Sequence, residues 1–159
     1  MRTLPIVHSL DGLTFAMAMA FFVGGYGCWV VPAVAEGSSV GHGEGGYVPD
    51  FVAIVRRYNA SGEPFRIQGV CKSACTLFLG IRNVCVERSA TLMFHAGHDI
   101  AENVTGPNTR ASRAAFYRYN EALRRYLLDG HHMDTDAFHS LSGSTIIDRF
   151  GYPECPLME

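Results

Sequence analysis

A long apolar segment near the start of the chain limits how much of the sequence can fold as a globular unit. Residues 13–34 are nearly all apolar and end in small residues, Ala33 and Ala35, before a polar run rich in glycine and serine. This pattern is typical of a signal peptide that is cleaved after Ala35. The segment is also long enough to span a bilayer, so an uncleaved membrane anchor is the competing interpretation. We favour cleavage, because several glycines and Pro32 weaken the segment as a helix.

Cleavage of residues 1–35 leaves residues 36–159, which is enough for one small domain with a modest core. The formal net charge of the chain is −2, and a surface so close to neutral offers no electrostatic footprint for nucleic acid. We therefore expect an exported protein, periplasmic or secreted, without a nucleic-acid partner. Membrane contact is expected only if residues 13–34 stay uncleaved.

Four cysteines remain in residues 36–159: Cys71, Cys75, Cys85 and Cys155. An even number of cysteines in an exported chain predicts two disulfides, and the sequence leaves all three pairings open. Metal binding is the competing interpretation, but Cys71 and Cys75 lack the second closely spaced pair of a zinc ribbon. His95 and His98 also lack the glutamate of a helical metalloprotease motif. We expect neither a metal nor a cofactor.

Helix and strand patterns alternate along the rest of the chain. Apolar residues recur at three- and four-residue steps from Val48 to Tyr58, which predicts a helix that ends before Gly62. The alternation over 65–68 predicts a strand that runs into a turn at Ser73. The remaining patterns predict a buried helix at 74–79, strands at 84–86 and 91–94, a loop at 99–109, one long helix at 111–128 and short helices around 138–141 and 146–150. This order favours an α/β fold with a small parallel sheet and flanking helices.

Ser73 opens the buried helix, and His95 follows the strand at 91–94. A serine hydroxyl is a poor nucleophile until a neighbouring imidazole takes its proton, so this pair suggests hydrolysis. The N–H of Ala74, in the first helical turn, and that of Gly46, in a glycine pair, are candidate donors to an oxyanion. In the competing interpretation, Ser73 only caps the helix and His95 is a structural residue at a strand end.

The same residues resemble the ClpP/crotonase superfamily. Gly69-x-x-x-Ser73 before an apolar helix, Gly45-Gly46 upstream and Met93-Phe94-His95 downstream are similar to that family, above all to small exported members with a Cys-x-Ser-Ala-Cys-Thr core. The resemblance covers roughly residues 45–95. It implies a trimmed ClpP/crotonase-like core in which Ser73 is the nucleophile, His95 is the base, and Gly46 and Ala74 form the oxyanion hole. It also implies a peptide or another carbonyl substrate, and a homo-oligomer, since the ClpP-like peptidases usually form rings.

The chain departs from this family in three ways. Cys71 and Cys75 flank the serine, so disulfide formation there would either stiffen the turn or block it. The family has further strands before the glycine pair, so the fold is either trimmed or completed by a neighbouring subunit. The acid that orients the histidine should fall near residues 134–148, where Asp134, Asp136 and Asp148 lie outside any matching motif. We choose Asp136. The alternative function is a catalytically inactive binding or assembly module that is stabilised by disulfides.

Overall fold

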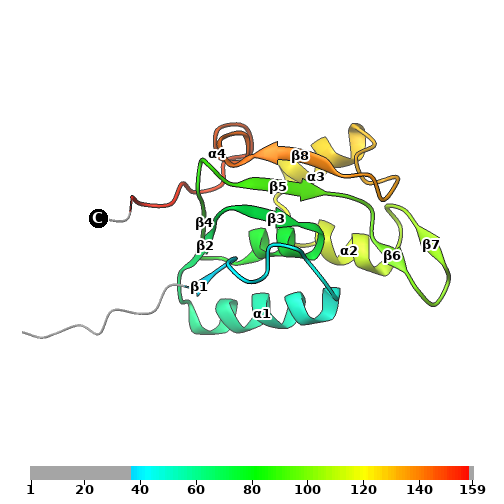
Figure 1. Ribbon diagram of the computed structural model, residues 1–159, viewed down its shortest axis with the longest axis horizontal. Helices are drawn as coiled ribbons and strands as arrows, with labels where there is room; N and C mark the ends of the chain where they lie inside the picture. The colour runs from blue at the N-terminus through cyan, green and yellow to red at the C-terminus, as the bar shows by residue number, and fades with distance from the viewer. Residues whose placement is uncertain (1–36, 158–159) are drawn as a thin grey trace, which may run out of the picture. The chain divides into compact units, whose positions relative to one another are not determined.

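The computed structural model describes residues 37–157, which contain short strands and helices (Figure 1). The predicted signal peptide, residues 1–35, lies outside the described residues. In chain order the elements are β1 (Gly37–Ser38), α1 (Val48–Ser61), β2 (Phe65–Ile67), β3 (Val70–Lys72), the 3₁₀ helix η1 (Ser73–Gly80), β4 (Val84–Val86), β5 (Thr91–Phe94), β6 (His98–Asp99), β7 (Val104–Thr105), α2 (Arg110–Phe116), α3 (Glu121–Asp129), β8 (His139–Ser142) and α4 (Gly143–Phe150).

The described strands form two three-stranded sheets and one two-stranded hairpin. The first sheet has the order β1-β2-β4, and both of its pairings are parallel. The second has the order β3-β5-β8, in which β3 and β5 are parallel while β8 is antiparallel to β5. The prediction of a mixed fold with a small parallel sheet and flanking helices is confirmed.

The strand predicted over 65–68 does not continue into the turn at Ser73. It ends at Ile67, and Gly69 then adopts a positive φ of 63°, a conformation that glycine reaches without steric cost. The chain crosses there into the second sheet, where β3 pairs Lys72 with Met93 of β5. Because the two strands are parallel, Ser73 and His95 leave the same edge of that sheet.

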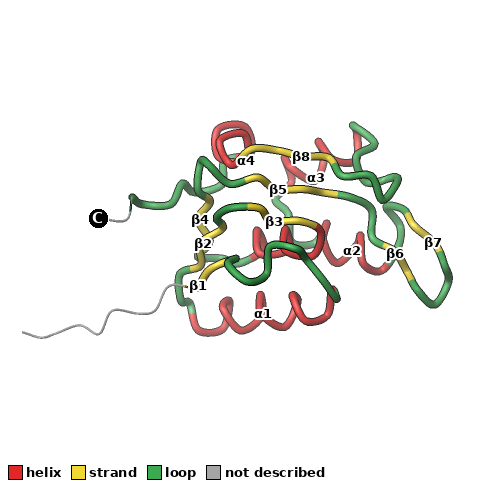
Figure 2. The backbone as a smooth tube through the Cα atoms, in the orientation of Figure 1, coloured by secondary structure: helices red, strands yellow, loops and turns green. Residues whose placement is uncertain are grey.

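Helix η1 is the central element of the core. Its residues from Ala74 to Leu79 are all buried, as an apolar run closed by Gly80 predicts. It packs against both α1 and α2, the two helices labelled in Figure 2. The Phe78 ring lies 5.3 Å from that of Phe51 in α1 and 4.6 Å from that of Phe65 in β2. Burial of this aromatic group fixes η1, and with it Ser73, against the rest of the domain.

The single long helix predicted over 111–128 is wrong, because the chain forms α2 and α3 with a break at Asn120. The Asn120 side chain accepts a hydrogen bond from the Leu123 N–H at 2.9 Å, as an N-cap does. Its amide also donates to the Phe150 carbonyl at 2.6 Å, and its backbone N–H donates to the Tyr152 hydroxyl at 2.9 Å. These contacts with Phe150 and Tyr152 stabilise the interruption between α2 and α3. The periodicity of apolar residues does not predict it.

The short helix predicted around 138–141 is also wrong. Residues His139–Ser142 form β8, whose register with β5 pairs His139 with Phe94 and Leu141 with Leu92. The edge of β5 supplies hydrogen-bond partners that a four-residue helix would lack. The second short helix is confirmed as α4, where Ser142 accepts a capping bond from the Thr145 N–H at 3.1 Å. The loop at 99–109 is confirmed except for the small β6–β7 hairpin, formed by His98–Asp99 and Val104–Thr105.

Residues 37–157 contain two disulfides, Cys71–Cys75 and Cys85–Cys155. The first spans the turn that carries Ser73, and the second ties β4 to the carboxyl-terminal segment. Such bonds form and persist in oxidising compartments, which is consistent with an exported protein. Among the described residues, no helix combines the length and the apolar character needed to cross a membrane.

Candidate catalytic site

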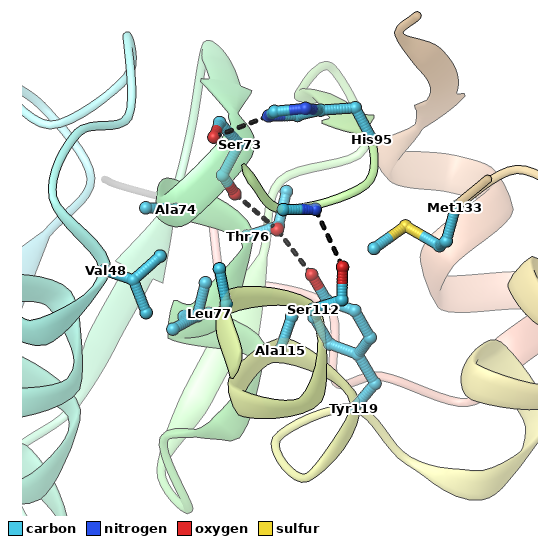
Figure 3. Close-up of a pocket in the computed structure, with 12 residues that line it drawn as sticks. Val48, Ser73, Ala74, Thr76, Leu77, His95, Ser112, Ala115, Tyr119 and Met133 are labelled. Carbon is cyan, nitrogen blue, oxygen red and sulfur yellow. Dashed lines mark hydrogen bonds between the residues drawn. The ribbon is translucent and has the colours of Figure 1, made fainter. Parts of the chain in front are cut away.

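Ser73 and His95 are in direct contact. The Nε2 atom of His95 lies 2.7 Å from the Ser73 hydroxyl oxygen, which is hydrogen-bond distance (Figure 3). Ser73 is the first residue of η1, and His95 directly follows β5. The side-by-side ends of β3 and β5 therefore bring the two predicted residues together. When Nε2 accepts this bond, the proton of the neutral ring resides on Nδ1.

The backbone of Ser73 has an unusual conformation. Its φ is +53°, in the left-handed region that non-glycine residues adopt at a cost of about 1–3 kcal/mol when the surroundings hold them there. The N-cap position of η1 belongs to Lys72, and Ser73 Oγ makes no capping bond with a described N–H. The hydroxyl is therefore directed to the imidazole and does not serve the helix end.

A buried pair of hydroxyl groups holds the Ser73 carbonyl. The Thr76 hydroxyl donates to Ser73 O at 2.7 Å and lies 2.6 Å from the hydroxyl of Tyr119 (Figure 3). Because Thr76 has a single hydroxyl proton, the proton between the two side chains comes from Tyr119. Burial raises the pKa of Tyr119, so its hydroxyl stays a neutral donor. The sequence assigned neither residue a role at the site: Thr76 is the threonine of the Cys-x-Ser-Ala-Cys-Thr core, and Tyr119 lies in no motif.

The Cys71–Cys75 disulfide braces the same turn from the core side. Both cysteines are fully buried, whereas Ser73 keeps partial exposure. The bridge closes a ring around the residue that carries the hydroxyl without covering it. Because the disulfide is buried and Ser73 is not, the bond stiffens the turn and does not block it.

The surroundings of His95 favour its neutral form. Burial lowers the pKa of His95 below its usual value, while the Ala96 backbone and the negative charge of Asp136 oppose this shift in part. Its Nδ1 atom is buried and forms no hydrogen bond of good geometry with any described residue. The Phe138 ring packs edge-on against the imidazole, with 4.8 Å between ring centroids. A neutral imidazole is the form that can accept a proton from serine.

The three candidate acids have different surroundings. Asp134 lies 2.9 Å from His131, and Asp148 forms an ion pair with Arg88 at 2.6 Å, so both are engaged elsewhere. Asp136 is exposed, on a segment joined to the residue after His95 by the Ala96 N–H bond to the Thr135 carbonyl at 2.8 Å. Asp136 acts on His95 through its charge, but no hydrogen bond joins the two side chains.

The glycine-rich loop lies against the serine turn, as predicted. The Lys72 N–H donates to the Gly43 carbonyl at 2.8 Å, which attaches the loop to β3. A methyl group on Gly45 would lie 2.7 Å from the Lys72 carbonyl oxygen and 2.9 Å from Ser73 Cβ, so only glycine fits. Within residues 37–157, the N–H groups of Gly46 and Ala74 donate to no protein acceptor.

The other histidines of interest lie apart from the Ser73–His95 pair or have structural contacts. His98 bonds to the Thr105 hydroxyl at 3.0 Å within the hairpin. His42, in the glycine-rich loop, packs edge-on against the rings of Phe51 and Phe78. The part of the chain that the structure describes contains no cluster of three or more His, Cys, Asp or Glu side chains that could hold a metal ion.

Comparison with known proteins adds no assignment. No protein-family model matches the chain, and no curated protein matches it. The chemistry of the site has to be argued from its own residues.

Proposed function

We propose that the protein is an exported serine hydrolase that cleaves a peptide or another carbonyl substrate. The observation that carries the proposal is the 2.7 Å contact between Ser73 Oγ and His95 Nε2. A nucleophile and a base at this distance can transfer a proton in one step. The left-handed backbone of Ser73, held by a disulfide and by Thr76, adds support, because strained residues of this kind cluster at active sites.

The reaction would proceed in two stages. Ser73 Oγ attacks the substrate carbonyl while His95 Nε2 takes its proton, and the carbonyl oxygen becomes an oxyanion that accepts hydrogen bonds from the Gly46 and Ala74 N–H groups. His95 then protonates the leaving group, and an acyl-enzyme remains. In the second stage His95 takes a proton from water, the resulting hydroxide attacks the acyl carbon, and Ser73 recovers its proton as the acid product leaves.

Asp136 is the acid that we assign to this mechanism. A carboxylate near Nδ1 stabilises the imidazolium that forms during attack, and Asp136 already favours the charged form of His95. We also propose that the parallel strands, the serine turn and the glycine loop form a trimmed ClpP/crotonase-like core. The two disulfides support export to an oxidising compartment.

A fluorophosphonate probe tests the proposal, because it phosphonylates only an activated serine. We expect the folded protein to be labelled and the Ser73→Ala variant to remain unlabelled at the same concentration. Ser89→Ala is the matched control, since Ser89 is exposed and its hydroxyl contacts only Glu87. Labelling that persists in Ser73→Ala, or no labelling of the folded wild-type protein, would refute a serine hydrolase that uses Ser73.

The second candidate is a catalytically inactive binding or assembly module. One observation favours it: His95 Nδ1 has no carboxylate partner among residues 37–157, whereas a complete triad has one. This candidate predicts a folded, disulfide-bonded protein that the probe does not label. The same experiment therefore distinguishes the two functions.

A further inference from the structure

A small cavity opens beside the Ser73–His95 pair, and both residues line it together with Ala74 (Figure 3). Its volume is about 30 Å³. On the same measure one water molecule needs roughly 10–15 Å³, so the cavity has room for about two water-sized groups. The cavity is thus smaller than an aromatic or a long aliphatic side chain.

Apolar and polar groups share the walls of the cavity in about equal measure. Leu77 of η1, Ala115 of α2 and Met133, which follows α3, supply much of the lining, and Met133 is almost completely buried. Thr76, Tyr119 and Ser112 also line it, but the first two hydroxyls bond to each other and to the Ser73 carbonyl, and the Ser112 hydroxyl donates to the Gly106 carbonyl. Apart from His95, no residue of the lining is ionisable near neutral pH. Such a space accepts a small uncharged group and excludes a charged one.

We infer that this cavity holds the side chain of the acyl group and restricts the enzyme to small acyl groups, with Met133 and Ala115 setting the size limit. The inference rests on the proposed hydrolase function. An acyl group bound to Ser73 Oγ stays next to the cavity through both stages, whereas the leaving group departs past His95. Acetyl and propionyl esters, or peptides with alanine or serine before the cleaved bond, have the right size. One methylene too many in an apolar pocket lowers kcat/KM by about tenfold or more.

The test uses p-nitrophenyl acetate, butyrate and octanoate, which share one leaving group and differ only in the acyl chain. We expect kcat/KM to be highest for acetate and to fall at least tenfold to octanoate. Met133→Ala should raise the butyrate-to-acetate ratio about tenfold, because it removes a thioether side chain that lines the cavity. Ala115→Val should lower the same ratio, because its extra methyl groups fill the space. Tyr117→Ala is the control, since this side chain is 82% exposed, and it should leave the ratio unchanged.

Each ratio is measured within one variant, so partial unfolding does not affect it. Ser73-dependent hydrolysis with a flat chain-length profile, or with ratios that Met133→Ala and Ala115→Val do not move, would overturn the size limit while leaving the hydrolase function intact. If no ester is hydrolysed in a Ser73-dependent way and the fluorophosphonate probe fails to label Ser73, the hydrolase function and the size limit both fall. Acetate preference together with opposite shifts in the two variants would support the inference.

Discussion

Replacement of Gly45 by alanine tests whether the glycine loop positions the serine. In the structure Gly45 has a φ of +79°, and an added Cβ would lie 2.7 Å from the Lys72 carbonyl oxygen, 2.9 Å from Ser73 Cβ and 3.3 Å from the Ala74 nitrogen. All three distances fall short of an ordinary van der Waals contact. Two of the three contacted atoms are backbone, which cannot move aside as a flexible side chain can. The added methyl group therefore displaces the serine turn or the loop.

Gly41 supplies the matched control for this substitution. It lies in the same loop with a φ of +83°, but a Cβ there would meet nothing within 4 Å. Both alanine variants therefore carry the same conformational cost, about 1–2 kcal/mol for a non-glycine residue in the left-handed region. Only Gly45→Ala adds a clash with Ser73. A shift of the nucleophile by about 1 Å is enough to lower the rate about 100-fold.

Two measurements separate these effects: the free energy of unfolding in urea and the rate of Ser73 labelling by the fluorophosphonate probe. We expect Gly41→Ala to lose about 1–2 kcal/mol of stability and to be labelled at the wild-type rate. Gly45→Ala should lose at least as much stability and be labelled about 100 times more slowly. Equal labelling rates in the two variants would refute the claim that the loop positions Ser73.

Two further predictions concern the base and the disulfides. The labelling rate should fall at acid pH as His95 becomes protonated, and the midpoint of this fall should lie below that of an ordinary histidine because burial lowers the pKa of His95. Asp136→Asn removes a negative charge that raises this pKa, so the midpoint should move to still lower pH in the variant. An upward shift of the midpoint in the pH–rate profile would contradict the role of Asp136. Replacing Cys85 and Cys155 by alanine removes a bond between cysteines that are 70 residues apart in the sequence. The free energy of unfolding in urea should fall by about 4 kcal/mol, and the labelling rate of the folded protein should not change. A slower labelling rate would mean that this disulfide also affects the site.

The sequence was informative where local chemistry decides the structure. Helix α1 ends at Gly62, which adopts the left-handed C-cap conformation that its position predicts. The positions of Ser73 and His95, each next to a short apolar element, together with the family resemblance, suggested that the two residues meet, and they do. The helix end depends on local conformation alone, whereas the contact of Ser73 with His95 also requires the parallel pairing of β3 with β5.

The sequence was uninformative where distant segments decide the structure. The break at Asn120 depends on Phe150 and Tyr152, thirty and more residues away, and β8 forms because the edge of β5 is open to it. The disulfide pairing likewise required the fold, since spacing alone left three alternatives. The sequence also did not identify a partner for His95 Nδ1. The family resemblance indicated the region in which an acid should lie, but no residue in that region matches the motif of the family.

The carboxyl-terminal segment has a consequence for solubility through its contact with β4. The Val86 N–H donates to the Pro153 carbonyl at 2.8 Å, the Cys155 N–H donates to the Val86 carbonyl at 3.0 Å, and Cys155 is bonded to Cys85. This segment covers the outer side of β4, which would otherwise present unpaired backbone groups to other molecules. A product that has lost the chain from residue 151 onward would expose both a sheet edge and the thiol of Cys85. Such molecules would associate edge to edge and become crosslinked, so proteolytic trimming of this end should convert a monodisperse protein into aggregates.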